Sequence, residues 1–368
     1  MNLIDPIRVL VVDDTVVYRK IVSDTIAALP GTEVVGTAHN GKAALTKIRS
    51  LKPDLITLDI EMPEMDGIEV LENLQVSSTD IGIIMLSTLT RAGGDLTMRA
   101  LELGAFDFVT KPESGGMAEN QRKLKTAIAP MIRAFARKRE IRQILKGKAG
   151  TAPSPPAGIV PIRRTAGPAS RRTRKSEIVA IGISTGGPNA LAQMMPGLPA
   201  DLRVPVLIVQ HMPPVFTQSL AKSLDGKCAI RVREAIDGEP LEPGTALIAP
   251  GGKQMKIEAG GDGLTRVVKI TDDPPESNCK PSADYLFRSV ARHYVGRATG
   301  VIMTGMGSDG FASLKLMKRN GAAIIAQDEA SCVVFGMPKA PVEAGIVDVI
   351  SPLEKIAGEI LKTVKPSP

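Results

Sequence analysis

The serine in the segment AIGISTGGP has the spacing of a hydrolase nucleophile. Gly182, Ser184 and Gly186 satisfy the pattern Gly-x-Ser-x-Gly, which in hydrolases places the serine on a sharp turn between a strand and a helix. Glycines permit this turn, and the backbone amides that follow can face an oxyanion. A helix start that Ser184 or Thr185 merely caps explains the same letters equally well, so both interpretations stay open at this point.

A nucleophilic serine needs a base, and the chain contains only three histidines. His39 belongs to the amino-terminal third, and His293 lies on an amphipathic helical pattern that favours a packing or surface role. His211 ends the apolar run VLIVQH and is the expected base, with a satisfied loop histidine as the alternative. An imidazole base needs an orienting carboxylate, and Asp309 in VIMTGMGSDG follows another buried run, so it is the expected partner.

A second group of chemically capable residues follows the apolar runs of the amino-terminal third. Asp13 and Asp14 come after the first run, Asp59 after the third and Lys111 after the fifth. Because the carboxyl ends of parallel strands meet at one edge of a sheet, three carboxylates are expected to converge there. Like charges held so close need a divalent cation, and oxygen ligands favour Mg²⁺. A helix cap explains any one of these aspartates alone, but not the whole set.

Short apolar runs that alternate with helical patterns must position both groups. Such runs are typical of parallel strands buried on both faces, and their two series predict two α/β domains. A region over 237–273 that is rich in glycine and proline predicts hairpins inserted into the second domain. The expected strands are Arg8–Val12, Glu33–Ala38, Leu55–Leu58, Ile81–Leu86 and Phe106–Thr110, then Ile178–Ile183, Val204–Val209, Thr299–Met303 and Ala322–Ile325.

The net charge of +7 is concentrated in one segment. From Lys146 to Lys175 the chain has eight basic residues and no acidic one, among prolines, alanines and glycines. This segment has no sustained apolar period and is predicted to be an extended, solvated linker, with a patch for an anionic partner as the alternative. The predicted boundaries are a domain over 1–127, a helix and basic linker over 128–175, and a second domain over 176–368.

Composition excludes several classes of protein. Hydrophobic residues make up 43% of the chain, so it can bury a core and is not disordered as a whole. Trp is absent and aromatic residues reach 3%, which argues against nucleic-acid stacking platforms. Three scattered cysteines provide neither a disulfide framework nor paired zinc ligands, which fits a reducing cytoplasm. The longest uncharged stretch contains several prolines, so no membrane insertion is expected.

The first series resembles a two-component receiver domain in the strings VLVVDD, LITLDIEMPEMDG, MLST and DFVTKP. The resemblance implies a flavodoxin-like, five-stranded parallel sheet that is phosphorylated by a chemotaxis histidine kinase. By position it implies these roles: Asp59 as phosphoacceptor; Asp13, Asp14, Asp59 and the backbone carbonyl of Glu61 as Mg²⁺ ligands; Ser87 and Lys111 as phosphoryl contacts; and Phe108 as the switch aromatic residue.

The second series resembles the chemotaxis-specific protein-glutamate methylesterase and protein-glutamine deamidase family. The strings are IGISTGGP, QHMPP, IAPGG, KPSADYLF, TGMGSDG and ASCVVFGMP, in that order behind the receiver pattern. The resemblance implies a doubly wound α/β esterase domain without a cofactor and methyl-accepting chemotaxis receptors as substrate. By position it implies these roles: Ser184 as nucleophile, His211 as general base and acid, Asp309 as orienting carboxylate, and the amides of Thr185 and Met306 as oxyanion donors. Ile183 stands where the family usually has alanine.

Two other functions compete with this interpretation. The string GMGSDG also satisfies Gly-x-Gly-x-x-Gly after a strand, with Asp328 18 residues beyond Gly310, which is the pattern of a dinucleotide-binding oxidoreductase. This unit lies late in its domain, and Asp309 would direct negative charge toward a pyrophosphate. A phosphorylation switch that only binds partners is the third class. No helix-turn-helix pattern indicates a transcription factor, and no nucleic-acid partner is expected.

Overall fold

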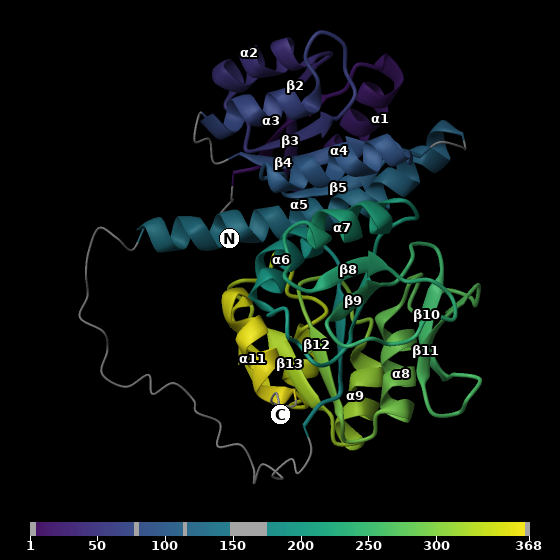
Figure 1. Ribbon diagram of the computed structural model, residues 1–368. Helices are drawn as coiled ribbons and strands as arrows, with labels where there is room; N and C mark the ends of the chain where they lie inside the picture. The colour runs from purple at the N-terminus through teal and green to yellow at the C-terminus, as the bar shows by residue number, and fades with distance from the viewer. Residues whose placement is uncertain (1–4, 77–80, 113–115, 148–174, 365–368) are drawn as a thin grey trace, which may run out of the picture.

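The structure is a computed structural model that describes residues 5–76, 81–112, 116–147 and 175–364 (Figure 1). These residues form two α/β domains, so the predicted fold class is confirmed. Most of the predicted basic linker, over 148–174, lies outside the described residues. No described helix combines the length and the apolar character that crossing a bilayer requires.

The amino-terminal domain contains a five-stranded parallel sheet in the order β2-β1-β3-β4-β5, which is the flavodoxin order. Each predicted strand is present, with its ends displaced by at most one residue. The strands are β1 (Ile7–Val12), β2 (Thr32–Ala38), β3 (Leu55–Asp59), β4 (Gly82–Ser87) and β5 (Asp107–Thr110). The helices are α1 (Val16–Ala27), α2 (Gly41–Leu51), α3 (Gly67–Val76), α4 (Arg91–Glu102) and α5 (Met117–Gly147).

Strand β1 illustrates why these apolar runs are nearly continuous. Successive side chains of a strand point to opposite faces of the sheet. Val9 and Val11 therefore join one core, with α1 and α5, while Leu10 and Val12 join the other. A strand that is covered on both faces needs apolar residues at every position, which leaves the polar residues at its carboxyl end.

The carboxyl-terminal domain contains a seven-stranded parallel sheet in the order β14-β13-β12-β6-β7-β9-β8. Its strands are β6 (Ile178–Ile183), β7 (Val206–Gln210), β8 (Arg231–Glu234), β9 (Thr245–Ile248), β12 (Ala298–Ile302), β13 (Ala323–Gln327) and β14 (Val349–Ser351). Helices α6 (Gly187–Met194), α7 (Phe216–Asp225) and α11 (Ile356–Thr363) pack into one core. Helices α8 (Ala283–His293) and α9 (Phe311–Arg319) pack into another, on the opposite face of the sheet. Two 3-10 turns (η2, Met195–Gly197; η3, Leu353–Lys355) and α10 (Lys339–Glu343) complete the domain.

The prediction of several inserted hairpins was only partly correct. Among the described residues of 237–273, one hairpin forms, between β10 (Gln254–Ala259) and β11 (Arg266–Thr271), and an isolated antiparallel bridge joins Pro240 to Val267 of β11. The run Thr245–Ile248 instead becomes β9 and pairs in parallel with β7 and β8. All four of its residues are buried, and a fully apolar run gains more from a place inside the main sheet than from an exposed hairpin.

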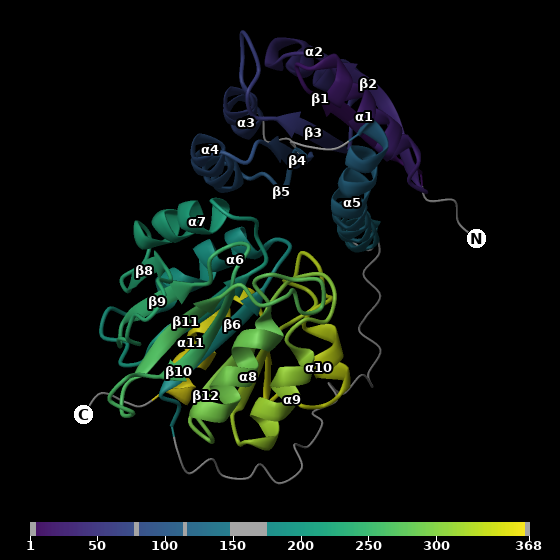
Figure 2. The ribbon, with the colours of Figure 1, turned by 90° about the vertical axis from the view of Figure 1, so that its right-hand side faces the viewer.

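The two domains are packed against each other in what we call the docked arrangement. Figure 2 shows α4 of the amino-terminal domain facing α7 of the second domain. The rings of Phe108 and Phe216 stack across the boundary, with centroids 4.8 Å apart. At the periphery, Lys222 pairs with Asp95 at 3.2 Å. The carboxyl-terminal edge of β6 and β7 is thereby covered by β5 and α5 of the first domain.

Candidate active site

Ser184 lies in the turn that joins β6 to α6, as the Gly-x-Ser-x-Gly spacing predicts. Gly186 adopts φ 73°, a conformation that glycine reaches without a steric penalty. A neighbouring turn packs tightly against the serine, because a Cβ at Gly305 would lie 2.7 Å from the Cβ of Ser184. From β7, the Nε2 of Gln210 donates a hydrogen bond to the Ser184 carbonyl at 3.0 Å. The serine turn is therefore fixed by two other segments of the domain.

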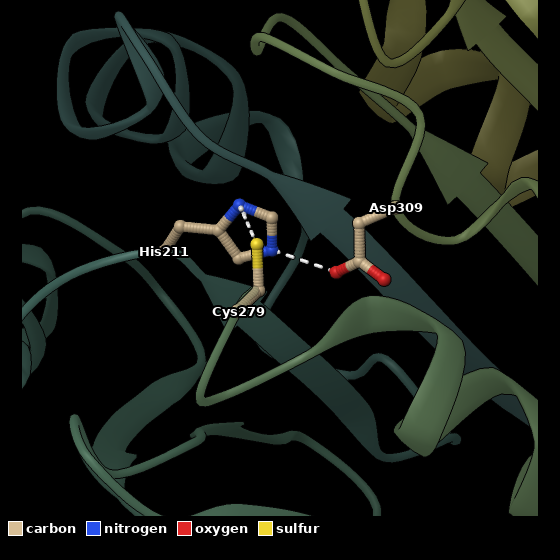
Figure 3. A group of neighbouring side chains, drawn as sticks. All are labelled: His211, Cys279 and Asp309. Atoms are coloured by element: carbon tan, nitrogen blue, oxygen red, sulfur yellow. Dashed lines mark hydrogen bonds and ion pairs between the residues drawn. The ribbon is translucent and has the colours of Figure 1, made fainter. Parts of the chain in front are cut away.

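His211 and Asp309, 98 residues apart in sequence, are brought into direct contact. Figure 3 shows the imidazole and the carboxylate facing each other, with His211 Nε2 2.8 Å from Asp309 Oδ2. Asp309 is only 3% exposed and accepts further hydrogen bonds from the Ser282 hydroxyl and from the backbone amides of Ala283, Asp284 and Gly310. So many donors fix the carboxylate, which can then hold the ring in one orientation.

The contact changes the pKa of both partners. Burial alone would lower the pKa of His211, but hydrogen bonds with Asp309 and with Cys279 outweigh burial and raise it to about 9. Burial alone would raise the pKa of Asp309, but the hydrogen bond and the charge of His211 lower it below its usual value. The arrangement therefore stabilises an imidazolium beside an ionised carboxylate, which is the charge state that proton uptake from a nucleophile creates.

Ser184 lines the same cavity as His211, a space of about 180 Å³ at the domain boundary. The two ring nitrogens of His211 contact Asp309 and Cys279, and no hydrogen bond joins the ring to the Ser184 hydroxyl among the described contacts. The structure thus places the three residues at one edge of the sheet and joins two of them. The catalytic assignment of Ser184, His211 and Asp309 stays a prediction.

The two amides expected to bind an oxyanion lie in adjacent turns. Thr185 lines the cavity, and Met306 follows Gly305, which packs against Ser184. In the described part of the chain, the backbone amides of both residues lack a backbone acceptor. Both donors are therefore available to a ligand, and their role also stays a prediction.

Two residues at this site were not singled out by the sequence. Cys279 Sγ lies 3.7 Å from His211 Nδ1 (Figure 3), and nothing in the spacing of a lone cysteine in this segment signals the contact. Asp107, from the other domain, lines the same cavity and accepts a hydrogen bond from the Gly186 amide at 3.1 Å. A charged residue inside the predicted strand Phe106–Thr110 was a visible signal, because a buried strand seldom keeps an acidic side chain without a partner.

A second cluster lies at the carboxyl edge of the amino-terminal sheet. Ligand oxygens of Asp13, Asp14 and Asp59 lie within 4.8 Å of one another. Lys111 Nζ lies 2.7 Å from Asp13 Oδ2 and 2.6 Å from Asp59 Oδ2. Burial raises the pKa of Asp59 to about 6, against the opposing effect of Lys111. The three carboxylates and the lysine thus converge as the sequence predicts.

The cluster fits a bound Mg²⁺. Asp13 and Asp59 are buried, and Lys111 forms an ion pair with each of them. With Asp14, the three carboxylates carry more negative charge than this one lysine neutralises, and a divalent cation held by carboxylate oxygens would balance the excess. The assignment of the Glu61 backbone carbonyl as a ligand stays a prediction, as do those of the three aspartates.

The remaining predicted residues of this domain occupy different environments. The Ser87 hydroxyl accepts a hydrogen bond from Thr97 at 2.8 Å, so in this arrangement it is engaged with α4 and not with Asp59. Phe108 points away from the cluster and stacks on Phe216 of the other domain. Their roles as phosphoryl contact and switch residue stay predictions. Ser87 thus contacts α4 and Phe108 belongs to β5, the two receiver elements that face the second domain.

The dinucleotide interpretation of GMGSDG is not favoured. Gly310 does cap α9 at φ 92°, as a phosphate-binding turn would. Its amide, however, donates to Asp309 at 3.0 Å. A buried carboxylate therefore occupies the position that a pyrophosphate would need.

Comparisons with known proteins agree with the geometry. Residues 179–360 match the family model "CheB methylesterase", and residues 9–121 match "Response regulator receiver domain". A protein-glutamate methylesterase/protein-glutamine glutaminase of Desulfotalea psychrophila is 56% identical over 365 residues, covering 98% of this chain and 99% of the relative. One from Bacillus subtilis is 45% identical over 364 residues, covering 98% and 99%. The crystal structure of the Thermotoga maritima CheB methylesterase catalytic domain shares 39% identity, with a TM-score of 0.50 over 51% of this chain and 99% of that one. The chain therefore belongs to the protein-glutamate methylesterase/protein-glutamine glutaminase family, with a receiver domain ahead of its esterase domain.

Proposed function

We propose that this protein hydrolyses glutamyl methyl esters on methyl-accepting chemotaxis receptors, under the control of phosphorylation of its receiver at Asp59. The observation that carries the proposal is the His211–Asp309 pair, whose histidine lines the same cavity as Ser184. The same site deamidates receptor glutamines, since an amide differs from the ester only in its leaving group. The protein acts in the cytoplasm, with a chemotaxis histidine kinase as phosphodonor and without a nucleic-acid partner.

Hydrolysis proceeds through an acyl-enzyme. The Ser184 hydroxyl attacks the ester carbonyl while His211 takes its proton at Nδ1, the nitrogen that does not face Asp309. The new C–O bond pushes the carbonyl electrons onto oxygen, where the amides of Thr185 and Met306 stabilise the negative charge. Return of the proton from His211 releases methanol, and water then repeats the cycle to free Ser184 and the glutamate.

The receiver chemistry takes place on Asp59. Its carboxylate attacks the phosphorus of the phosphodonor to form an aspartyl phosphate, and Lys111 lies close enough to neutralise charge on the transferred group. Asp13, Asp14, Asp59 and the carbonyl of Glu61 would hold Mg²⁺, which supplies further charge neutralisation when bound. The Ser87 hydroxyl must leave Thr97 to follow the new phosphate.

Control follows from the docked arrangement. The esterase cavity is lined on one side by Asp107, Phe108, Val109 and Thr110 of β5, so a receptor segment cannot reach Ser184 while the receiver is in place. Phosphorylation at the carboxyl edge of β3 would shift the packing of α4 and β5 and release the second domain. The triad itself need not change.

Methanol release from methylated receptor tests the proposal. We expect Ser184→Ala to lose activity on the order of a thousandfold or more, while Ser308→Ala, an exposed serine in a neighbouring turn, keeps it. Addition of a phosphodonor should raise the rate of wild type and not that of Asp59→Asn. An Asp59→Asn variant that responds as fully as wild type would refute the switch, and an active Ser184→Ala would refute the esterase mechanism.

A further inference from the structure

Helix α6 begins at Gly187, three residues after Ser184, and has no capping side chain of its own. Its N-cap residue is Gly186, which offers no side-chain acceptor, and Pro188 in the first turn has no amide hydrogen. The first amides of a helix lack partners within the helix and carry partial positive charge. The Gly187 amide donates to the Ser184 carbonyl at 2.7 Å, so it is the Gly186 amide that needs an acceptor from elsewhere.

The acceptor comes from the receiver. Asp107 Oδ2 accepts a hydrogen bond from the Gly186 amide at 3.1 Å, and its Oδ1 accepts one from the Phe108 amide at 2.9 Å. Asp107 is 4% exposed and lines the same cavity as Ser184. One turn along α6, the Nδ2 of Asn189 donates to the Ala105 carbonyl at 3.1 Å, so the helix start is held to this segment at two points.

The Asp107 side chain that accepts from the Gly186 amide is a carboxylate, the same chemical group that the proposed esterase forms as its product. Hydrolysis of a glutamyl ester at Ser184 leaves a carboxylate next to the turn that contains the Gly186 amide. We propose that the Gly186 amide is a carboxylate subsite of the esterase, occupied by Asp107 while the receiver is docked and by the product glutamate once the receiver has left. This inference rests on the proposed function, from which it takes the chemistry of the product.

The interactions that keep Asp107 at this subsite allow another carboxylate to replace it. Burial raises the pKa of Asp107 to about 6, and the two backbone amides only partly oppose that effect. No cationic side chain of the described residues pairs with it, whereas the peripheral carboxylate Asp95 pairs with Lys222. A buried carboxylate that only backbone amides hold loses less interaction energy on release than one in an ion pair, so another carboxylate can replace Asp107.

Competition for one amide couples the two occupants. A carboxylate that can bind the Gly186 amide only after Asp107 has left shifts the docking equilibrium toward the released receiver. Release of the receiver raises the affinity of the amide for that carboxylate by the same factor. Bound product and phosphorylation of the receiver would then both shift the equilibrium away from the docked arrangement. The receiver would inhibit not only by covering the cavity but also by supplying a substitute for the product.

The test follows the Gly186 amide by nuclear magnetic resonance in the full-length, ¹⁵N-labelled protein, with glutarate as the carboxylate probe and uncharged glutaramide as its control. In Asp107→Ala we expect glutarate to shift the Gly186 resonance in a saturable way and to bind roughly tenfold or more tighter than in wild type. Glutaramide should not shift it. Wild type carrying beryllofluoride and Mg²⁺ on the receiver, a phosphoryl mimic, should respond to glutarate in the same way without any substitution.

Asp95→Ala is the matched control, because it removes an interdomain carboxylate that does not touch α6. We expect it to behave like wild type toward glutarate. The proposal is overturned by an unresponsive Gly186 in Asp107→Ala, by an equal response to glutaramide, or by an Asp95→Ala response equal to that of Asp107→Ala, which would indicate general opening. The readout needs no turnover, so a protein that binds glutarate but releases no methanol would count against the esterase and not against the subsite.

Discussion

The ring of Phe108 stacks on the ring of Phe216 across the domain boundary, with centroids 4.8 Å apart and planes 23° apart. Phe108 belongs to β5 of the receiver, and Phe216 is the first residue of α7 in the esterase domain. Both rings are buried. One aromatic pair therefore connects β5 of the receiver, whose Phe108 lines the esterase cavity, with α7 of the esterase domain.

Removal of this stack should weaken docking and raise the activity of the unphosphorylated enzyme. An aromatic pair contributes about 1 kcal/mol beyond its buried area, so Phe108→Ala should increase the undocked fraction and the basal rate of methanol release by roughly fivefold or more. Phe135→Ala is the matched control, because Phe135 contacts Phe106 within the receiver. A basal rate in Phe108→Ala no higher than in Phe135→Ala would show that the stack does not hold the domains together.

Docking should weaken as the pH rises through about 6. Burial at the boundary raises the pKa of Asp107 to about 6 from its ordinary value near 3.8, so the docked form binds the proton more tightly than a released receiver would. Its contribution to docking is therefore fully present below about pH 4, is lost as the pH rises from there through about 6, and stays constant at higher pH. A hydrogen bond with Ser219 lowers the pKa of Asp95. Burial would raise the pKa of Glu102, but hydrogen bonds with Lys227 and Ser223 outweigh burial and lower it, so both carboxylates stay ionised between pH 5 and 7.5.

Small-angle X-ray scattering of the unphosphorylated full-length protein measures this equilibrium. The radius of gyration should increase from pH 5 to pH 7.5 in wild type. Asp107→Asn cannot titrate, so its radius should not change over this range. Equal pH dependence in the two proteins would assign the effect to another group.

A methyl group at Gly305 should distort the turn that carries Ser184. The Cβ of Gly305→Ala would lie 2.7 Å from the Ser184 Cβ and would also overlap Met337 Sδ. Relief requires movement of the Ser184 turn, so kcat should fall by about a hundredfold, with a loss of stability of roughly 1–3 kcal/mol. Gly358→Ala, on an exposed helical position with open space around its Cβ, should keep full activity. Wild-type kcat in Gly305→Ala would contradict the tight packing of these turns.

The sequence predicted the sheets well because buried parallel strands leave a continuous apolar signal, as in Leu55–Asp59, where every residue is buried. It predicted the convergence of His211 and Asp309 because strand ends share one edge of a sheet. It did not predict strand β8, a short edge strand with three charged residues, whose pairing depends on its neighbour β9. The contacts Asp107–Gly186 and Cys279–His211 were also missed, since they depend on domain docking and on a loop that carry no local periodicity.

Loss of Lys111 should make the receiver depend on Mg²⁺. Lys111 is the cation beside Asp13 and Asp59, and all three side chains are almost inaccessible to solvent. Lys111→Ala leaves two buried carboxylates without a counter-charge, which should cost about 3 kcal/mol in a buffer without divalent cations. Bound Mg²⁺ would replace the missing charge, so its addition should raise the Tm of Lys111→Ala more than that of wild type, whose lysine already provides it. Lys123→Ala, which removes an exposed ion pair with Glu119 on α5, should respond to Mg²⁺ as wild type does. An equal shift in all three proteins would mean that these carboxylates do not form the cation site.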